Sequence, residues 1–381
     1  MAETRRWHTL LEVSSLFLKL GTISFGGPAA HISLIEQEIV QRRKWLSREH
    51  FLDLLAATNL VPGPNATEMA IHISFIRAGW PGLVVGGIAF ILPSFLISLV
   101  LSWAYVRFGT LPQGSALFYG INPVVIAIIL VAIYRLGKTA IKDKKAVVVG
   151  VVAFVAALLG VNEVLVLLVA GLAGIFLYTP PNWLRWKPTL TVFLPALPLA
   201  APWPDDRLVK LGLFFLKVGS LLFGSGMVLF AFIQRDVVTR YGWLTQQQLI
   251  DAIAVGQMTP GPVLSSATFI GYLVAGWVGA AVATVAVFLP SFVIVTLTGP
   301  LIQRLRGSPV AQAFLQGVNT AVVALILAVS VALFRSAIVD VWTALIMGVG
   351  LALLLRYRVD TIWLVVSGAA FGYVHYLMVG R

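Results

Sequence analysis

The most chemically suggestive stretch of the sequence is Pro62-Gly63-Pro64, which stands inside an apolar region. Neither proline has an amide donor, and the first restricts the residue before it, so a helix entering this stretch must end. A new helix can start at the second proline, which suits a first helical turn. The unpaired amides and the dipole of that helix attract an anion. Asn65 and Thr67 follow directly and add side-chain donors.

The same element recurs in the second half of the chain as Pro260-Gly261-Pro262, followed by Ser265 and Ser266. For one such element, a simple kinked span is the plainer explanation. Two of them favour a functional break, because a broken helix inside a membrane is tolerated only where protein or a watery cavity satisfies the freed backbone. We therefore predict that both elements contribute to one anion site.

Glycine-rich stretches precede each Pro-Gly-Pro element. Gly26 and Gly27 lie in the first, and Gly224 and Ser225 lie in the second. Glycine lets the backbone approach a ligand closely, whereas close helix packing through small residues is equally typical of membranes. We include these four residues in the predicted site and keep helix packing as the alternative.

Two lysines stand in otherwise apolar sequence, Lys19 and Lys217. A charge inside a membrane is costly, so it usually marks a site or a paired partner. Snorkelling of the amine to the headgroups is the alternative. Asp53 and Asp251 are candidate partners for these lysines, although helix capping would also explain them.

Glu68 and His72 lie four residues apart, so they share one face of a helix. Titratable pairs of this kind carry protons in pumps, and we predict a proton-coupling role; a local helix contact is the alternative. The chain has no cysteine, and its five histidines show no metal-ligand spacing. We predict no metal and no cofactor.

Composition indicates an integral membrane protein that contacts lipid. Hydrophobic residues make up 59% of the chain and charged residues 11%, with a mean hydropathy of +0.94. A soluble domain carries about a quarter charged residues. The net charge of +12 arises from basic clusters between apolar runs, as in cytoplasmic loops, and does not indicate nucleic-acid binding. The first apolar run is interrupted by charges and no cleavable signal peptide is expected.

The chain contains an internal duplication. The segment Phe17–Gly21 returns as Phe215–Gly219, 198 residues later, and Leu92–Phe95 returns as Leu289–Phe292, 197 residues later. One nearly constant register over about 100 residues indicates a repeated unit. We predict a first repeat at 1–178, a proline-rich linker at 179–210 and a second repeat at 211–381.

Loop charges indicate that the two copies are inverted. In the first copy a nearly neutral loop around Arg107 precedes a basic loop from Arg135 to Lys145, and in the second copy the order is reversed. Inverted repeats place their site at the membrane midplane. The predicted fold is an all-α polytopic membrane protein with two homologous inverted-topology repeats, broken or re-entrant helices and about 10–12 membrane segments.

The order and spacing of these motifs resemble the chromate transporter (CHR) family in its long, two-domain form. The resemblance is carried by Phe17–Gly21, Phe25–Pro28 and Pro62–Pro64, and again by Phe223-Gly224 and Thr259–Pro262. It implies a multi-pass secondary transporter of the bacterial inner membrane that exports chromate, confers chromate resistance and draws on the proton motive force. The second copy departs from the first by having Ser225-Gly226 where the first has Gly27-Pro28.

The leading function is therefore export of a tetrahedral oxyanion by alternating access, with chromate or sulfate as the transported ligand. A transporter for sulfate or another oxyanion and an anion channel are the alternatives. A membrane enzyme acting on lipid phosphates is disfavoured, because the sequence shows no cluster of nucleophiles or metal ligands. The oligomeric state, including a homodimer, is left open.

Overall fold

The computed structural model describes residues 2–25, 27–109, 111–179, 206–223, 226–298, 308–357 and 359–379. Every regular element in these ranges is helical, which confirms the predicted fold class. The first copy forms α1 (Ala2–Ile23), α2 (Pro28–Glu36), η1 (Gln37–Arg42), α3 (Arg48–Thr58), α4 (Asn65–Phe108), α5 (Pro112–Ala140), α6 (Lys144–Leu158) and α7 (Glu163–Tyr178). The second copy forms α8 (Arg207–Gly219), η3 (Gly226–Val228), α9 (Leu229–Phe232), η4 (Ile233–Arg240), α10 (Gln246–Met258), η5 (Val263–Ser265), α11 (Ser266–Thr298), α13 (Pro309–Ala337), α14 (Val341–Ala352), η6 (Leu353–Tyr357) and α15 (Thr361–Val379).

The predicted helix breaks are present in both copies. In the first copy α3 ends at Thr58 and α4 begins at Asn65, on either side of Pro-Gly-Pro. In the second copy α10 ends at Met258, and a short 3-10 turn begins at Val263 and runs into α11. The glycine-rich stretches likewise separate α1 from α2 and α8 from η3. Gly26, Gly224 and Ser225, and the stretch 180–205, lie outside the described residues.

The helix after each Pro-Gly-Pro element folds back on itself. In α4 the backbone leaves helical geometry at Ala78 and Gly79, where Gly79 has φ +63°. In α11 the equivalent glycine, Gly276, has φ +61°. The two arms lie against each other, because Thr268 and Thr284, sixteen residues apart, are joined through their hydroxyls at 2.7 Å. Each element is therefore a re-entrant half-helix followed by a longer returning helix.

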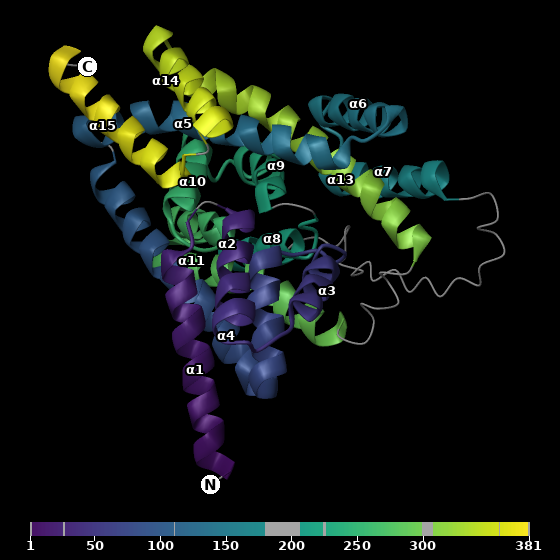
Figure 1. Cartoon of the computed structure of the whole chain (residues 1–381). Helices are drawn as coiled ribbons and strands as arrows, with labels where there is room; N and C mark the ends of the chain where they lie inside the picture. Colours follow the sequence, from purple (N-terminus) through teal and green to yellow (C-terminus); the bar gives the residue numbers. More distant parts are fainter. Residues whose placement is uncertain are drawn as a thin grey trace.

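The helices form two groups, each built from both copies. The core bundle consists of α1–α4 and α8–α11, in which α1 packs along α4, α8 packs along α11, and α4 packs on α11. The outer bundle consists of α5–α7 and α13–α15, in which the copies exchange helices: α7 packs on α13, and α15 packs on α5. Figure 1 shows α5, α13, α14 and α15 along the upper part of the molecule and α1, α2, α3 and α4 below.

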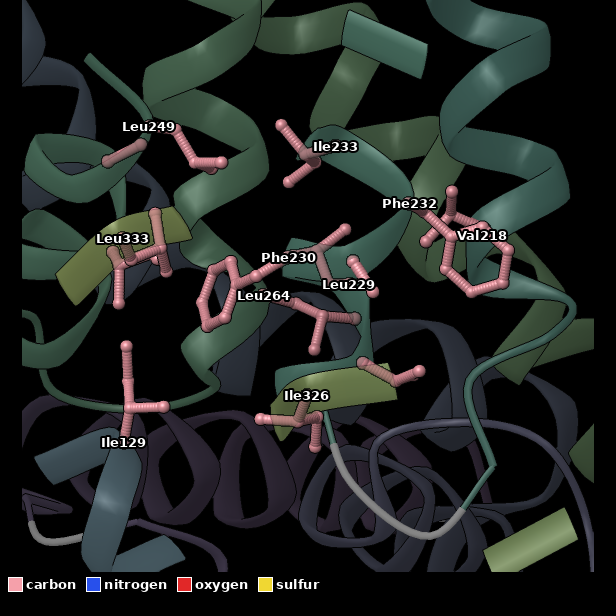
Figure 2. Packing of buried hydrophobic residues seen from close by; sticks show 14 of the residues in the cluster. Ile129, Val218, Leu229, Phe230, Phe232, Ile233, Leu249, Leu264, Ile326 and Leu333 are labelled. Atoms are coloured by element: carbon pink, nitrogen blue, oxygen red, sulfur yellow. The ribbon is translucent and has the colours of Figure 1, made fainter. Parts of the chain in front are cut away.

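The apolar packing differs between the copies. One buried cluster joins the second copy's α8–α11 to the outer bundle. Figure 2 shows part of it, with Phe230 of α9 beside Leu333 of α13. The first copy's α1–α4 have a separate cluster of their own. The outer bundle is thus packed on one copy's half of the core bundle.

Among the described residues, five helices are long and apolar enough to cross a membrane: α4, α5, α11 with the preceding 3-10 turn, α13 and α15. Two shorter apolar helices cover Glu163–Tyr178 and Val341–Tyr357. Asn122 and Asn319 lie at equivalent places within α5 and α13, which begin at Pro112 and Pro309.

Close helix packing generates a first prediction. Gly120 on α5 lies so close to the Gly368 carbonyl on α15 that a Cβ at position 120 would collide with backbone. Gly120→Ala should therefore lower thermal stability by about 1–3 kcal/mol, the usual cost of overpacking. Gly348→Ala on α14 is the control, since its Cβ would meet nothing within 4 Å. Equal melting temperatures of the two variants in detergent would show that α5 and α15 do not pack as described.

Candidate functional site

The centre of the core bundle is held by two reciprocal backbone hydrogen bonds. The amide of Gly63 donates to the carbonyl of Leu222 at 2.8 Å, and the amide of Gly261 donates to the carbonyl of Ser24 at 2.8 Å. Gly63 and Gly261 are equivalent positions, 198 residues apart, and so are Ser24 and Leu222. Each Pro-Gly-Pro element therefore binds the glycine-rich break of the other copy. We call this arrangement the crossing.

Serines of the repeated Leu-Pro-Ser-Phe motif line the crossing. A Cβ built at Gly63 would lie 3.1 Å from the Ser291 hydroxyl, and one at Gly261 would lie 3.3 Å from the Ser94 Cβ. Both serines are fully buried, and each comes from the copy opposite to the glycine it faces. The recurrence of a hydroxyl after a mid-helix proline was the signal that could have added Ser94 and Ser291 to the predicted site.

Several buried polar atoms around the crossing have no hydrogen-bond partner among the described residues. They are the side-chain oxygens of Ser24, Thr67, Glu68 and Ser291, and Nε2 of His72. The first four of these residues have essentially no exposed surface, and His72 is 5% exposed. Buried polar groups are nearly always satisfied, so such a concentration needs an explanation. A polar ligand bound at the crossing would supply it.

Glu68 occupies the centre of this group. It lies in the first turn of α4, and its carboxylate folds back over Gly63 so closely that any side chain at position 63 would collide with it. His72 is one turn further along the same helix. His31 on α2 is also buried and hydrogen-bonds the backbone of Ser24. In the second copy Leu229 stands in place of His31. The second-copy segment that corresponds to Glu68 and His72, residues 265–270, contains no titratable side chain, so these titratable groups belong to the first copy alone.

The hydroxyls of the second Pro-Gly-Pro element are internally satisfied. Ser265 and Thr259 are joined through their hydroxyls at 2.7 Å, and Ser266 donates to the Val263 carbonyl at 3.0 Å. Ser98 on α4 donates to the Ser265 carbonyl, which ties the copies together again. In the first element, by contrast, Thr67 has no such partner. The donor atoms left available to a ligand are concentrated in the first copy.

Asn65, a further predicted donor, uses its amide within the loop. Its Nδ2 donates to the Asn59 side chain at 2.6 Å. Gly27 caps α2 in an extended, positive-φ conformation and its carbonyl accepts from Ala30 and His31. Pro62 and Pro64 flank the crossing glycine of the first copy, as Pro260 and Pro262 do in the second.

Each intramembrane lysine forms an ion pair with an acid of its own copy. Lys19 Nζ lies 2.8 Å from Glu38 Oε1, and Lys217 pairs with Asp236. Glu38 and Asp236 are equivalent positions that the sequence analysis missed, although both are acids spaced 198 residues apart.

Asp251 is not the partner of Lys217, which was one of the two roles considered for it, beside helix capping. Asp251 instead accepts from the Tyr105 hydroxyl at 2.7 Å and from Gln247 at 3.1 Å. Asp251 is buried between α10 and α4, where hydroxyl and amide donors satisfy it without a cation.

Comparison with known proteins identifies the repeat. The family model described as chromate transporter matches residues 11–175 and 209–373. The chromate transport protein of Cupriavidus metallidurans is 38% identical over 95% of this chain and 92% of its own length. A probable chromate transport protein of Synechococcus elongatus is 34% identical over 89% and 88%, respectively.

More distant relatives bear no substrate in their names. An uncharacterized transporter of Methanocaldococcus jannaschii is 28% identical over 98% of this chain and 96% of its own length. No solved structure matches the chain.

The crossing generates a second prediction. Gly261 has φ +87° and Gly276 has φ +61°, so alanine at either position costs about 1–2 kcal/mol of backbone strain. Only at Gly261 would a Cβ also press on a neighbour, the Ser94 Cβ at 3.3 Å. A backbone shift that relieves this contact would lengthen the hydrogen bond that the Gly261 amide donates across the copies, which is worth about 1 kcal/mol. Gly261→Ala should lower the melting temperature further than the control Gly276→Ala. Equal losses would mean that position 261 is not packed against Ser94 of the other copy as described.

Proposed function

The chain belongs to the chromate transporter family, and from that premise we propose that it carries chromate across the membrane by alternating access through the crossing. The observation that supports the site most directly is the set of buried donors without partners beside two broken helices. A compact dianion with four oxygens would accept from the Thr67 and Ser291 hydroxyls and from the amides at the start of α4.

We propose chromate as the substrate because the similar proteins with substrate names carry that name. The crossing itself suits any tetrahedral dianion, and sulfate presents nearly the same oxygen surface. Sulfate is therefore the expected competitor. The bacterial inner membrane, with its lipid around the apolar helices, is the proposed location.

Lys19 and Lys217 retain a proposed role in attracting the anion. Each pairs with a carboxylate from the π-helical segment of its own copy: Lys217 with Asp236, and Lys19 with Glu38. Glu38 also pairs with Arg42 and Arg43, so it neutralises only part of the positive charge around Lys19. An approaching dianion competes with that carboxylate for the lysine. Because Lys19 is half exposed whereas Lys217 is mostly covered, the first copy's lysine is the more accessible of the two.

Glu68 is the proposed proton carrier. An ionised carboxylate buried without a cationic partner is strongly disfavoured, and one beside a bound dianion is more so. Glu68 should therefore be protonated when the anion is bound, and its hydroxyl can then donate to an anion oxygen. His72 on α4 and His31 on α2 are the nearby groups through which a proton can reach it.

This arrangement moves one proton together with one dianion, a net charge of minus one. A membrane potential that is negative inside then drives the complex outward, which agrees with the proposed direction of export. An anion channel using the same helix ends is the competing function. It would pass chromate without any dependence on a proton.

A transport assay separates these functions. Inverted vesicles with the membrane potential clamped at zero should accumulate labelled chromate when the medium is more acidic than the lumen, because the proton gradient pulls the coupled anion inward. Unlabelled sulfate added to the medium should compete. A channel would only equilibrate chromate under these conditions, so equilibration without accumulation would exclude the coupled mechanism.

Glu68→Gln tests the proton carrier. The amide keeps the shape and the uncharged state, so the variant should still exchange chromate across the membrane while losing its acceleration by an imposed pH gradient. Glu49→Gln, an exposed acid in the first turn of α3, is the control and should behave as the unaltered protein. A Glu68→Gln variant that accumulates chromate normally in response to the pH gradient would remove Glu68 from the coupling.

A further inference from the structure

One ion pair joins the core bundle to the outer bundle across the copies. Arg235 in η4 lies 3.1 Å from Glu163 at the start of α7, and the two side chains are 32% and 10% exposed. Arg235 belongs to the second copy's half of the core bundle, and Glu163 belongs to the outer bundle. A partly buried pair of this kind holds two groups of helices in one relative position more effectively than an exposed pair.

Apolar packing closes the same side of the molecule. Figure 2 shows Phe230 of α9 beside Leu333 of α13, with Leu249 of α10, Ile129 of α5 and Ile326 of α13 in the same buried cluster. These residues are all buried. The side formed by α9, η4 and α10 is therefore sealed against the outer bundle.

The opposite side lacks the ion pair. Arg235 corresponds to Gln37, which is exposed. The helices α7 and α15 correspond through Gly174 and Gly372, which pack in the same way on α13 and α5. That register makes Thr361 the counterpart of Glu163, since each is the first residue of its helix.

A pocket opens where the counterpart contact would lie. Its volume is about 610 Å³, and it is lined by Ile23, Phe25 and Ser33 on the core bundle and by Asp360 and Trp363 on the outer bundle. Ile23 and Phe25 border the glycine-rich break whose Ser24 carbonyl takes part in the crossing. This pocket therefore borders the glycine-rich break of the crossing on the first copy's side.

Equivalent positions on α3 and α10 show the same difference. Leu52 on α3 is 47% exposed, whereas its counterpart Ile250 on α10 is 0% exposed. Asp53 is exposed, whereas Asp251 is 3% exposed. Two halves with matching folds thus differ in how the outer bundle covers them, as expected for one end state of a carrier whose halves exchange conformations.

We propose that the Arg235–Glu163 ion pair is a gate latch that keeps the access path beside α9 and α10 closed, and that its absence at Gln37 and Thr361 makes the two gates unequal. The proposal rests on the proposed alternating-access function. In the opposite state the repeat symmetry would place α2 against α5, α3 against α13 and η1 against α15, while α9 and α10 separate from the outer bundle. The latch biases the resting protein toward the state described here.

Thiol labelling tests the latch without measuring transport. The chain has no cysteine, so a single cysteine reports one position. Ser33 lies in the open pocket, and its counterpart Ala231 is 3% exposed; we replace each in turn by cysteine. A membrane-impermeant maleimide in vesicles of both orientations should label position 33 readily and position 231 slowly.

Removing the latch should speed labelling at position 231, and introducing an equivalent ion pair on the first copy's side should slow labelling at position 33. Arg235→Gln should accelerate labelling at position 231 about tenfold, a population shift equivalent to about 1.4 kcal/mol. The double variant Gln37→Arg with Thr361→Glu should slow labelling at position 33. The charge exchange Arg235→Glu with Glu163→Arg should restore slow labelling at position 231, which separates loss of the latch from loss of folding.

The matched control is Arg77→Gln, which removes an arginine–glutamate pair of 3.0 Å between α1 and α4, inside the core bundle. It should leave both labelling rates unchanged. Unchanged labelling at position 231 in Arg235→Gln, or failure of position 33 to label from either side, would overturn the latch. A labelling shift in a protein that fails to accumulate chromate would keep the latch and reject the proposed proton-coupled transport of chromate.

Discussion

The whole arrangement depends on the need to satisfy backbone groups that two broken helices release inside a membrane. Hydrocarbon offers no hydrogen-bond partner, so an unpaired amide or carbonyl there costs several kcal/mol. The amides of Gly63 and Gly261 find the carbonyls of Leu222 and Ser24, each in the other copy. In this structure each copy satisfies a broken helix of the other, so the two copies depend on each other for the bonding of their central backbone.

The crossing brings polar side chains together at the place where the backbone is irregular. Thr67, Glu68 and Ser291 lie fully buried beside it without partners among the described residues. The second copy's hydroxyls, in contrast, bond one another or nearby carbonyls. The two copies share one backbone arrangement but differ in their side chains. The first copy holds most of the buried polar atoms without partners, whereas both copies contribute the backbone of the crossing.

A second divergence concerns the contact between the two bundles. The second copy's half of the core bundle shares one apolar cluster with the outer bundle, whereas the first copy's half has its own. The Arg235–Glu163 pair lies on the packed side and has no charged counterpart at Gln37 and Thr361. A carrier with one polar site and two unequal gates has a preferred resting state, and that preference follows from these few side chains rather than from the repeat itself.

The sequence by itself determined the membrane class, the duplication and the position of every helix break at Pro-Gly-Pro, because composition, register and the missing proline amides are local properties. It also placed Thr67, Glu68 and Gly261 in the predicted site. The partners of those residues were decided only by the tertiary structure: Ser24 meets Gly261, Glu38 rather than a more distant acid meets Lys19, and Asp251 meets Tyr105. These contacts join residues from different helices, and most of them join the two copies. Local sequence carries no information on which helix of one copy faces which helix of the other, since that choice follows from how the two bundles pack in space.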